Sequence, residues 1–118
     1  MSESAAIHLS VSLSGCKNPW LHDEVWLSEN MIDILGQSGI AVSQSRFFRY
    51  YESFFLVFKS GWMSLFLCEN IVHLDIFSQD LSKNELETML SRIASRVEAS
   101  EIHSVFLRRG RHVKVIRN

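Results

Sequence analysis

Two groups in the sequence have the residue types of a reactive site. Ser60 carries a hydroxyl that could act as a nucleophile, and His73 and Asp75 alternate along a predicted strand. Residues two apart on a strand project from the same face, so this imidazole and carboxylate could pair as a base and its orienter. A serine hydroxyl stays protonated at physiological pH and is a weak nucleophile without an adjacent base. An ordinary half-exposed strand carries the same His-x-Asp pattern, and that interpretation is favoured for the pair.

The histidines and cysteines do not show the spacing of a metal site. No two of the five histidines are arranged as H-x-x-x-H or H-E-x-x-H, so a metal site would need long-range assembly with Cys16, Cys68 or acidic residues. None is expected. The two cysteines lack CxxC spacing, and we expect both thiols to be buried as small hydrophobic groups in a reduced environment.

The composition is that of one compact domain. The 118 residues are 47% hydrophobic, and 12 basic against 13 acidic residues give a net charge of −1. A chain of this length forms a single domain, 1–118, with its own core, and its balanced charge does not favour nucleic acid. The N-terminus lacks the pattern of a signal peptide, and no apolar run reaches the roughly 20 residues of a membrane span. A cytoplasmic location is expected.

The first third of the chain predicts a strand followed by a helix. Residues 7–13 alternate apolar and polar side chains, which is the period of a half-buried strand. Asn18-Pro19 fits a helix start, with Asn18 as the cap and Pro19 as the first helical residue. Gly36 and Gly39 supply stop signals. The expected buried face of this helix consists of Leu21, Val25, Ile32 and Leu35.

The rest of the chain predicts four strands, a helix and two more strands. The strands fall in residues 40–48, 54–58, 62–68, 71–77, 102–107 and 112–116. Ser82-Lys83-Asn84-Glu85 has the form of a capping box. Apolar residues follow it at helical spacing, at Leu86, Met89, Leu90, Ile93 and Val97. Runs of strands between two amphipathic helices favour a two-layer α+β sandwich, in which a mostly antiparallel sheet carries both helices on one face.

An open face on such a sheet would carry aromatic side chains that need a partner. Aromatic residues gather in the middle of the sequence, at Phe47, Phe48, Tyr50, Tyr51, Phe54, Phe55, Phe58, Trp62 and Phe66. We expect most of these rings to lie in the core or in a dimer interface, in preference to a base-stacking platform. A homodimer is therefore expected.

A series of landmarks along the chain points to one family. His8-Leu9 lies on the first strand, which ends in Gly15-Cys16, and Phe48-Arg49-Tyr50 ends the second. Residues 60–69 follow, running from Ser60 to Glu69, and then Asp75-Ile76-Phe77. In this order the landmarks resemble those of the short prokaryotic S-adenosylmethionine decarboxylases, over nearly the whole length of the chain. The resemblance implies the sandwich fold described above.

The resemblance also implies a chemistry that this sequence has largely lost. In that family a serine attacks its own preceding carbonyl, the chain breaks, and the resulting pyruvoyl group is the electron sink for decarboxylation. Ser60 matches that serine, with Lys59 where glutamate is usual. The match places Gly61 and Leu65 at two histidine positions, and Gln79 at the cysteine that serves as general acid. Leucine cannot move a proton, and glutamine is no acid near neutral pH. We therefore expect no cofactor to be made.

These observations favour a non-catalytic protein. It would bind a small ligand, with Glu69, His73 and Asp75 as candidate contacts, or act as a regulatory partner subunit, as a homodimer or with a catalytic relative. One alternative is an active pyruvoyl-dependent decarboxylase of S-adenosylmethionine or another amino acid, in polyamine biosynthesis, that uses Ser60. A second is a nucleic-acid or protein adaptor that uses the basic segment 108–117. Charge on an edge strand also prevents sheet-to-sheet aggregation, so nucleic acid is the less favoured partner.

Overall fold

The computed structural model describes residues 6–108 and 113–117, with side chains described for residues 6–105. The elements follow one another as β1 (Ile7–Ser14), α1 (Glu24–Gln37), β2 (Val42–Phe48), the 3-10 turn η1 (Arg49–Tyr51), β3 (Ser53–Phe58), β4 (Gly61–Cys68), β5 (Ile71–Ser78), α2 (Lys83–Arg96), β6 (Glu101–Arg108) and β7 (Val113–Arg117). Apart from the short turn η1, this is the order of strands and helices expected from the sequence.

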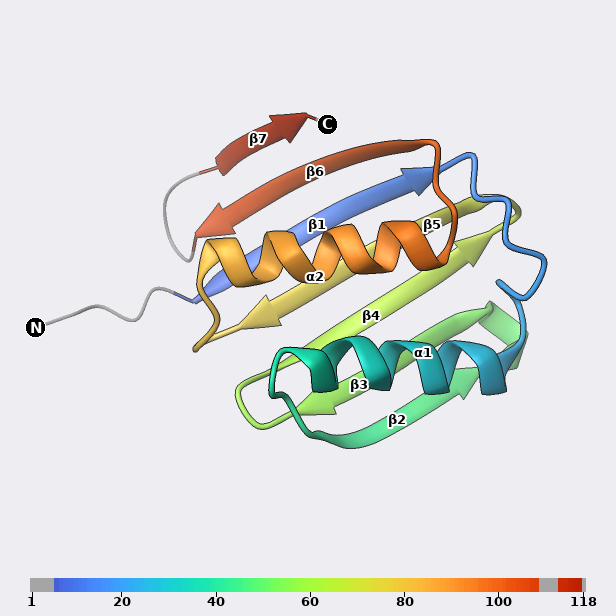
Figure 1. Cartoon of the computed structure of the whole chain (residues 1–118), viewed down its shortest axis with the longest axis horizontal. Helices are drawn as coiled ribbons and strands as arrows, with labels where there is room; N and C mark the ends of the chain where they lie inside the picture. The colour runs from blue at the N-terminus through green and yellow to red at the C-terminus, as the bar shows by residue number, and fades with distance from the viewer. Residues whose placement is uncertain (1–5, 109–112, 118) are drawn as a thin grey trace, which may run out of the picture.

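A single seven-stranded sheet runs through the molecule in the order β2-β3-β4-β5-β1-β6-β7. Every neighbouring pair of strands is antiparallel. Both helices cover the same face of this sheet (Figure 1). The predicted α+β sandwich is confirmed. The other surface of the sheet, which the two helices leave uncovered, is called the open face below.

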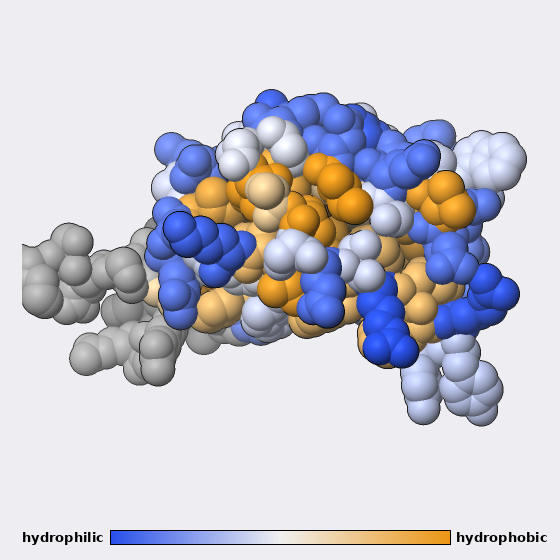
Figure 2. Space-filling model, turned by 90° about the horizontal axis from the view of Figure 1, so that it is seen from below, coloured by the Kyte–Doolittle hydropathy of each residue, from blue (hydrophilic) through white to orange (hydrophobic). Residues whose placement is uncertain are grey.

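The core lies between the helices and the covered face of the sheet. In β1 the apolar residues Ile7, Leu9, Val11 and Leu13 are buried, and the polar residues between them are half-buried. Strands β3, β4 and β5 alternate in the same way. Each of these strands therefore sends every second side chain into the core and the others to the open face. Seen from the β2 side, hydrophobic residues form a band between polar ones (Figure 2).

Helix α2 begins and packs as predicted. The Ser82 hydroxyl accepts the backbone N–H of Glu85 at 3.1 Å, and the Glu85 carboxylate accepts the backbone N–H of Ser82 at 2.8 Å. This reciprocal capping box satisfies two N–H groups that would otherwise lack helical partners. Leu86, Met89, Leu90, Ile93 and Val97 are all buried against the sheet layer, so the predicted helical spacing is confirmed.

Helix α1 begins later than predicted, and the expected start was wrong. Its cap is Asp23, whose side chain accepts the backbone N–H three residues on, at 2.8 Å. Asn18 and Pro19 belong to the loop before it. The side-chain oxygen of Asn18 accepts the N–H of Trp20 at 2.7 Å, and its amide donates to the carbonyl of Arg96, also at 2.7 Å. An asparagine that bonds to the backbone two residues on folds a turn in competition with a helix.

The predicted buried face of α1 was also wrong in part. The helix buries Leu27, Met31, Ile34 and Leu35. Val25 and Ile32 are exposed, and Leu21 is buried within the loop before the helix. The buried stripe follows the i, i+4, i+7, i+8 pattern from Leu27. The predicted end is confirmed, since Gly39 follows the helix with a φ of +77°, which glycine adopts without steric cost.

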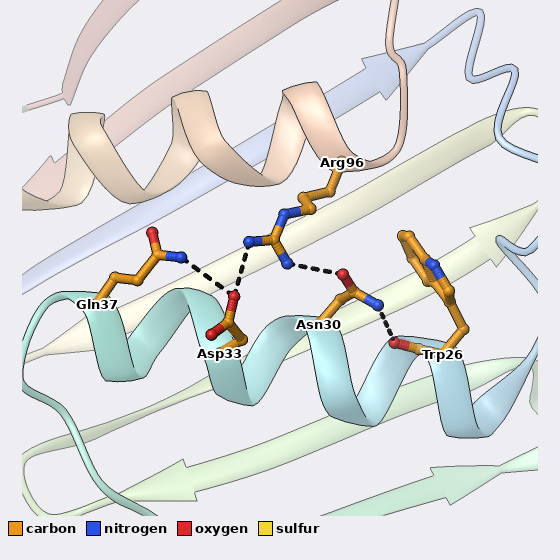
Figure 3. Close-up of polar contacts among 5 residues, drawn as sticks. All are labelled: Trp26, Asn30, Asp33, Gln37 and Arg96. Carbon is orange, nitrogen blue, oxygen red and sulfur yellow. Dashed lines mark hydrogen bonds and ion pairs between the residues drawn. The ribbon is translucent and has the colours of Figure 1, made fainter.

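A polar network joins the two helices across their exposed surfaces (Figure 3). Arg96 of α2 donates to Asn30 and to Asp33 of α1, at 2.7 Å each. Gln37 donates to the same Asp33 carboxylate, and Asn30 donates to the carbonyl of Trp26. Each helix therefore restrains the position of the other over the sheet.

One further expectation, that both thiols are buried, is corrected by the fold. Cys16 is buried, and burial raises the pKa of its thiol, but Cys68 is exposed at the end of β4. Of the nine aromatic residues in the middle of the chain, only Phe54 and Phe58 are buried in the core. Tyr50 and Tyr51 are exposed in the connection between β2 and β3. Within the described residues, neither helix is long and apolar enough to cross a membrane.

Candidate functional site

Ser60 lies in the tight turn between β3 and β4. Its carbonyl accepts the backbone N–H of Gln79 at 2.9 Å, so the end of β5 lies directly beside it. The structure thus brings together the two positions that the resemblance assigns to the nucleophile and the general acid. The Ser60 hydroxyl, however, makes no hydrogen bond to any residue that the structure describes. Among the described residues, the group has neither a base to activate it nor a donor to orient it.

Gly61 occupies a position where no side chain fits. A Cβ placed on this residue would lie 1.9 Å from the backbone oxygen of Phe77 and 2.9 Å from the ring of Phe58. Strands β4 and β5 therefore approach each other closely at this point. The resemblance assigns a histidine to this position. In this chain the backbone itself excludes it.

Leu65 lies on the face of the sheet that the helices cover. It is fully buried among the core residues beneath the helices. Its neighbours on β4, Ser64 and Phe66, belong to the open face. The second histidine position of the resemblance is therefore an ordinary core position here.

An ion pair and an aromatic stack form the centre of the open face. His8 Nε2 on β1 lies 2.9 Å from Asp75 Oδ1 on β5, and both side chains are about one-third exposed, at 34% and 35%. Trp62 stacks between Phe55 and Phe77, with centroid distances of 6.0 Å on each side. The His8 ring meets the edge of Trp62 at 5.6 Å. The open face thus combines a histidine–aspartate pair with a row of stacked aromatic rings.

The three predicted ligand contacts are dispersed in the structure. His73 and Asp75 share the open face as expected, but Asp75 pairs with His8, and His73 stacks on Phe66 with centroids 6.1 Å apart. Glu69 lies in the turn between β4 and β5, with a φ of +54°. Sequence reasoning missed His8 as the partner of Asp75, because that contact depends on β1 lying beside β5. No local pattern carries that information.

A groove of about 580 Å³ lies at the other end of the sheet from Ser60, between the start of α1 and the connection from β2 to β3. His22 bridges the Glu52 carboxylate at 2.5 Å and the Glu69 carbonyl at 3.1 Å, and Arg49 pairs with Glu24 at 2.6 Å. Both partners of His22 are acceptors, so its ring is satisfied at both nitrogens when it is protonated. The polar groups of this groove mostly form hydrogen bonds and ion pairs with one another, and these contacts hold the start of α1 against two turns. The described residues contain no cluster of metal ligands.

Comparison with known proteins gives a fold and no sequence relative. No protein-family model matches the sequence, and no curated protein is similar to it. Among solved structures, the chain is similar to the crystal structure of the adenosylmethionine decarboxylase from Aquifex aeolicus VF5, with a TM-score of 0.72. The two are 11% identical, and the similarity covers 94% of this chain and 95% of that one. At this identity the likeness concerns architecture. The chain has an adenosylmethionine decarboxylase-like fold.

Proposed function

We propose that this chain is a non-catalytic protein of the adenosylmethionine decarboxylase-like fold that acts by binding a partner through its open face. The observation that carries the proposal is the close approach of strands at Gly61, next to Ser60. A side chain that could assist the serine has no room there. On this proposal the chain shares its ancestry with the decarboxylases that it resembles and lacks their activity.

Self-processing needs proton transfer around the serine, and the described residues near Ser60 do not supply it. A serine attacks a carbonyl only when a base accepts its proton. The adjacent position is Gly61, Leu65 lies in the core on the covered face, and Gln79 contributes its backbone N–H. The residues present therefore do not fit the formation of a pyruvoyl group.

The open face supports binding of a flat, largely apolar partner. Trp62 stacks with Phe55 on one side and Phe77 on the other, so this ring is not free to stack on a nucleobase. In the described part of this surface, Arg46 is the one arginine or lysine side chain. A polyanion would need several such cations. A second protein surface fits the open face better than nucleic acid does.

The intact mass of the purified protein under denaturing conditions tests the loss of processing. We expect a single chain near 13.6 kDa, identical in the wild type and in Ser60→Ala apart from the substituted atom. Two fragments divided between Lys59 and Ser60 in the wild type, and their absence in Ser60→Ala, would restore the decarboxylase and refute the proposal. A Ser64→Ala variant is the matched control, because it removes a hydroxyl from β4 and leaves the turn unchanged.

A further inference from the structure

We propose that the outer edge of β2 takes up one more strand, supplied by an extended peptide of a partner protein in which acidic and apolar residues alternate. This edge is distinct from the open face, and its occupation does not depend on whether the chain has lost catalysis. Three observations carry the inference: the direction of the backbone groups on β2, the position of Arg46, and the apolar surface between β2 and α1.

Strand β2 ends the sheet on one side, so no described strand pairs with its outer edge (Figure 1). Its middle residues, from Ser43 to Arg46, are all exposed. Proteins commonly protect such an edge with proline, with several charges or with a bulge. β2 has no proline and a single charged residue, and its one irregularity lies at the Val42 end. The stretch from Gln44 to Phe48 is therefore regular and suited to pairing with a further strand.

The hydrogen bonds of the sheet show which β2 residues point their backbone groups to the outer edge. The N–H of Leu67 on β4 donates to the carbonyl of Glu52 at 2.9 Å, so alternate residues from Glu52 along β3 bond to β4. The residues between them, including Phe55, bond to β2, and Arg46 lies opposite Phe55. Arg46 therefore points its backbone groups inward. Its neighbour Ser45 presents an N–H and a C=O to the outer edge.

Arg46 is the charged group that an added strand would meet. Toward that strand Arg46 occupies a non-hydrogen-bonded site, where the Cα atoms of opposite residues lie only about 4.5 Å apart. Its guanidinium lies over the Phe48 ring at 5.0 Å and forms no ion pair with a described residue. An acidic residue opposite Arg46 would complete a cross-strand ion pair. A second copy of β2 supplies none, because residues 42–48 contain no aspartate or glutamate.

The other side of the added strand would lie against apolar surface. Successive side chains of a strand alternate between its two faces, so those that do not share the face of Arg46 point toward α1. On that side Phe47 of β2 and Val25 of α1 line the groove described above. Val25 and Ile32 are exposed, and the hydrophobic band reaches the surface when the molecule is seen from the β2 side (Figure 2). Apolar residues of the peptide would cover this band.

Two synthetic peptides of seven residues, the length of β2, test the choice of partner. In one peptide valine and glutamate alternate, and in the other valine and lysine alternate. Fluorescence anisotropy of the labelled peptides measures their binding to the full chain. Main-chain hydrogen bonds are common to both peptides, so the charge decides between them. We expect the glutamate peptide to bind the wild type at least tenfold more tightly than the lysine peptide, and Arg46→Glu to reverse that preference.

Ser45→Pro tests the pairing of the backbone. Proline is tolerated on an edge strand where the N–H points away from the sheet, so this substitution removes an edge donor and no hydrogen bond to β3. It should weaken binding of the glutamate peptide at least tenfold. Ser45→Ala keeps the N–H, and its affinity should stay within about twofold of the wild type. Circular dichroism verifies that both variants are folded.

N-methylation of the glutamate peptide gives the same test without changing the protein. Methyl groups on the alternate residues whose N–H groups face β2 should abolish binding, and methyl groups on the remaining residues should preserve it. Equal binding of the two methylated peptides would overturn the strand pairing, even if Ser45→Pro fails to fold.

Several other results would overturn the inference. Without saturable binding of the glutamate peptide, the edge does not accept a strand. Equal binding of the glutamate and lysine peptides would exclude an acidic partner, and binding that a folded Ser45→Pro leaves unchanged would place the peptide elsewhere. Self-association of the wild type that Ser45→Pro abolishes would assign the edge to a second copy. The mass measurement concerns catalysis alone, so a cleaved chain would leave the peptide results standing.

Discussion

The close approach at Gly61 makes a strong prediction about stability. In Gly61→Ala the added carbon would lie 1.9 Å from the Phe77 backbone oxygen, whereas ordinary contact begins at 3.4 Å, so the atoms must separate by about 1.5 Å. The position of the added Cβ is fixed by the backbone of residue 61, and the Phe77 oxygen belongs to the backbone of β5, so neither atom can rotate away while the β4–β5 ladder holds. Overpacking a rigid site costs about 1–3 kcal/mol, and the backbone contact here places the expected loss at about 3 kcal/mol. For a chain of this size that loss lowers the Tm by roughly 12 °C.

Gly36 provides a matched control for the same substitution. It lies within α1, and a Cβ placed there meets nothing within 4 Å. Replacing a helical glycine with alanine restricts the unfolded chain, so Gly36→Ala should stabilise the protein by about 0.5–1 kcal/mol. Urea unfolding followed by circular dichroism measures both variants. If Gly61→Ala unfolds within about 0.5 kcal/mol of the wild type, the strands do not approach as described, and the steric argument against a catalytic side chain fails with it.

Three further predictions concern the helices and the thiols. Ser82→Ala removes one half of the α2 capping box and should lower the free energy of unfolding, measured by thermal denaturation, by about 1 kcal/mol. An unchanged Tm would show that the Ser82 hydroxyl does not stabilise the helix. Met31→Ala should lower the free energy of unfolding by about 2–5 kcal/mol and Val25→Ala by less than about 0.5 kcal/mol, because the first side chain is fully buried and the second is 61% exposed. The opposite order of losses would show that α1 buries the face expected from the sequence. Cys68 should react with a thiol reagent in the native protein at about pH 8, whereas Cys16 should react only on unfolding, because it is buried and burial raises the pKa of its thiol. Two equally fast thiols would show that the loop around Cys16 opens.

The parts of the fold that the sequence predicted are those fixed by neighbouring residues. The alternation of β1 and the Ser82 capping box depend on residues two or three positions apart, and both are confirmed. The prediction of where α1 begins failed because the Asn18 side chain has two partners outside a helix. It accepts the N–H of Trp20 in its own turn, and it donates to the carbonyl of Arg96, far along the chain. Contacts of that kind cannot be read from local spacing.

The sequence predicted individual residues of the candidate site but not the contacts between them. Sequence reasoning named Ser60 and Asp75, and the structure places the backbone of Ser60 beside that of Gln79. The pairing of Asp75 with His8, and the absence of room at Gly61, both arise from strands that are distant in sequence. The register of such strands becomes visible only when the sheet has been assembled.

The position of β1 has a consequence for how the chain folds. This first strand lies between β5 and β6, so its partners come from the middle and the far end of the sequence. During synthesis, β2 to β5 can form a continuous meander as they emerge, whereas β1 remains with at least one unpaired edge until β6 has been made. Contacts of such long sequence separation carry a large loop-closure cost and slow the folding of a domain. An unpaired apolar strand is also the element on which another chain can pair by mistake, so fusions and truncations at the C-terminal end should impair solubility more than changes in the β2–β3 connection.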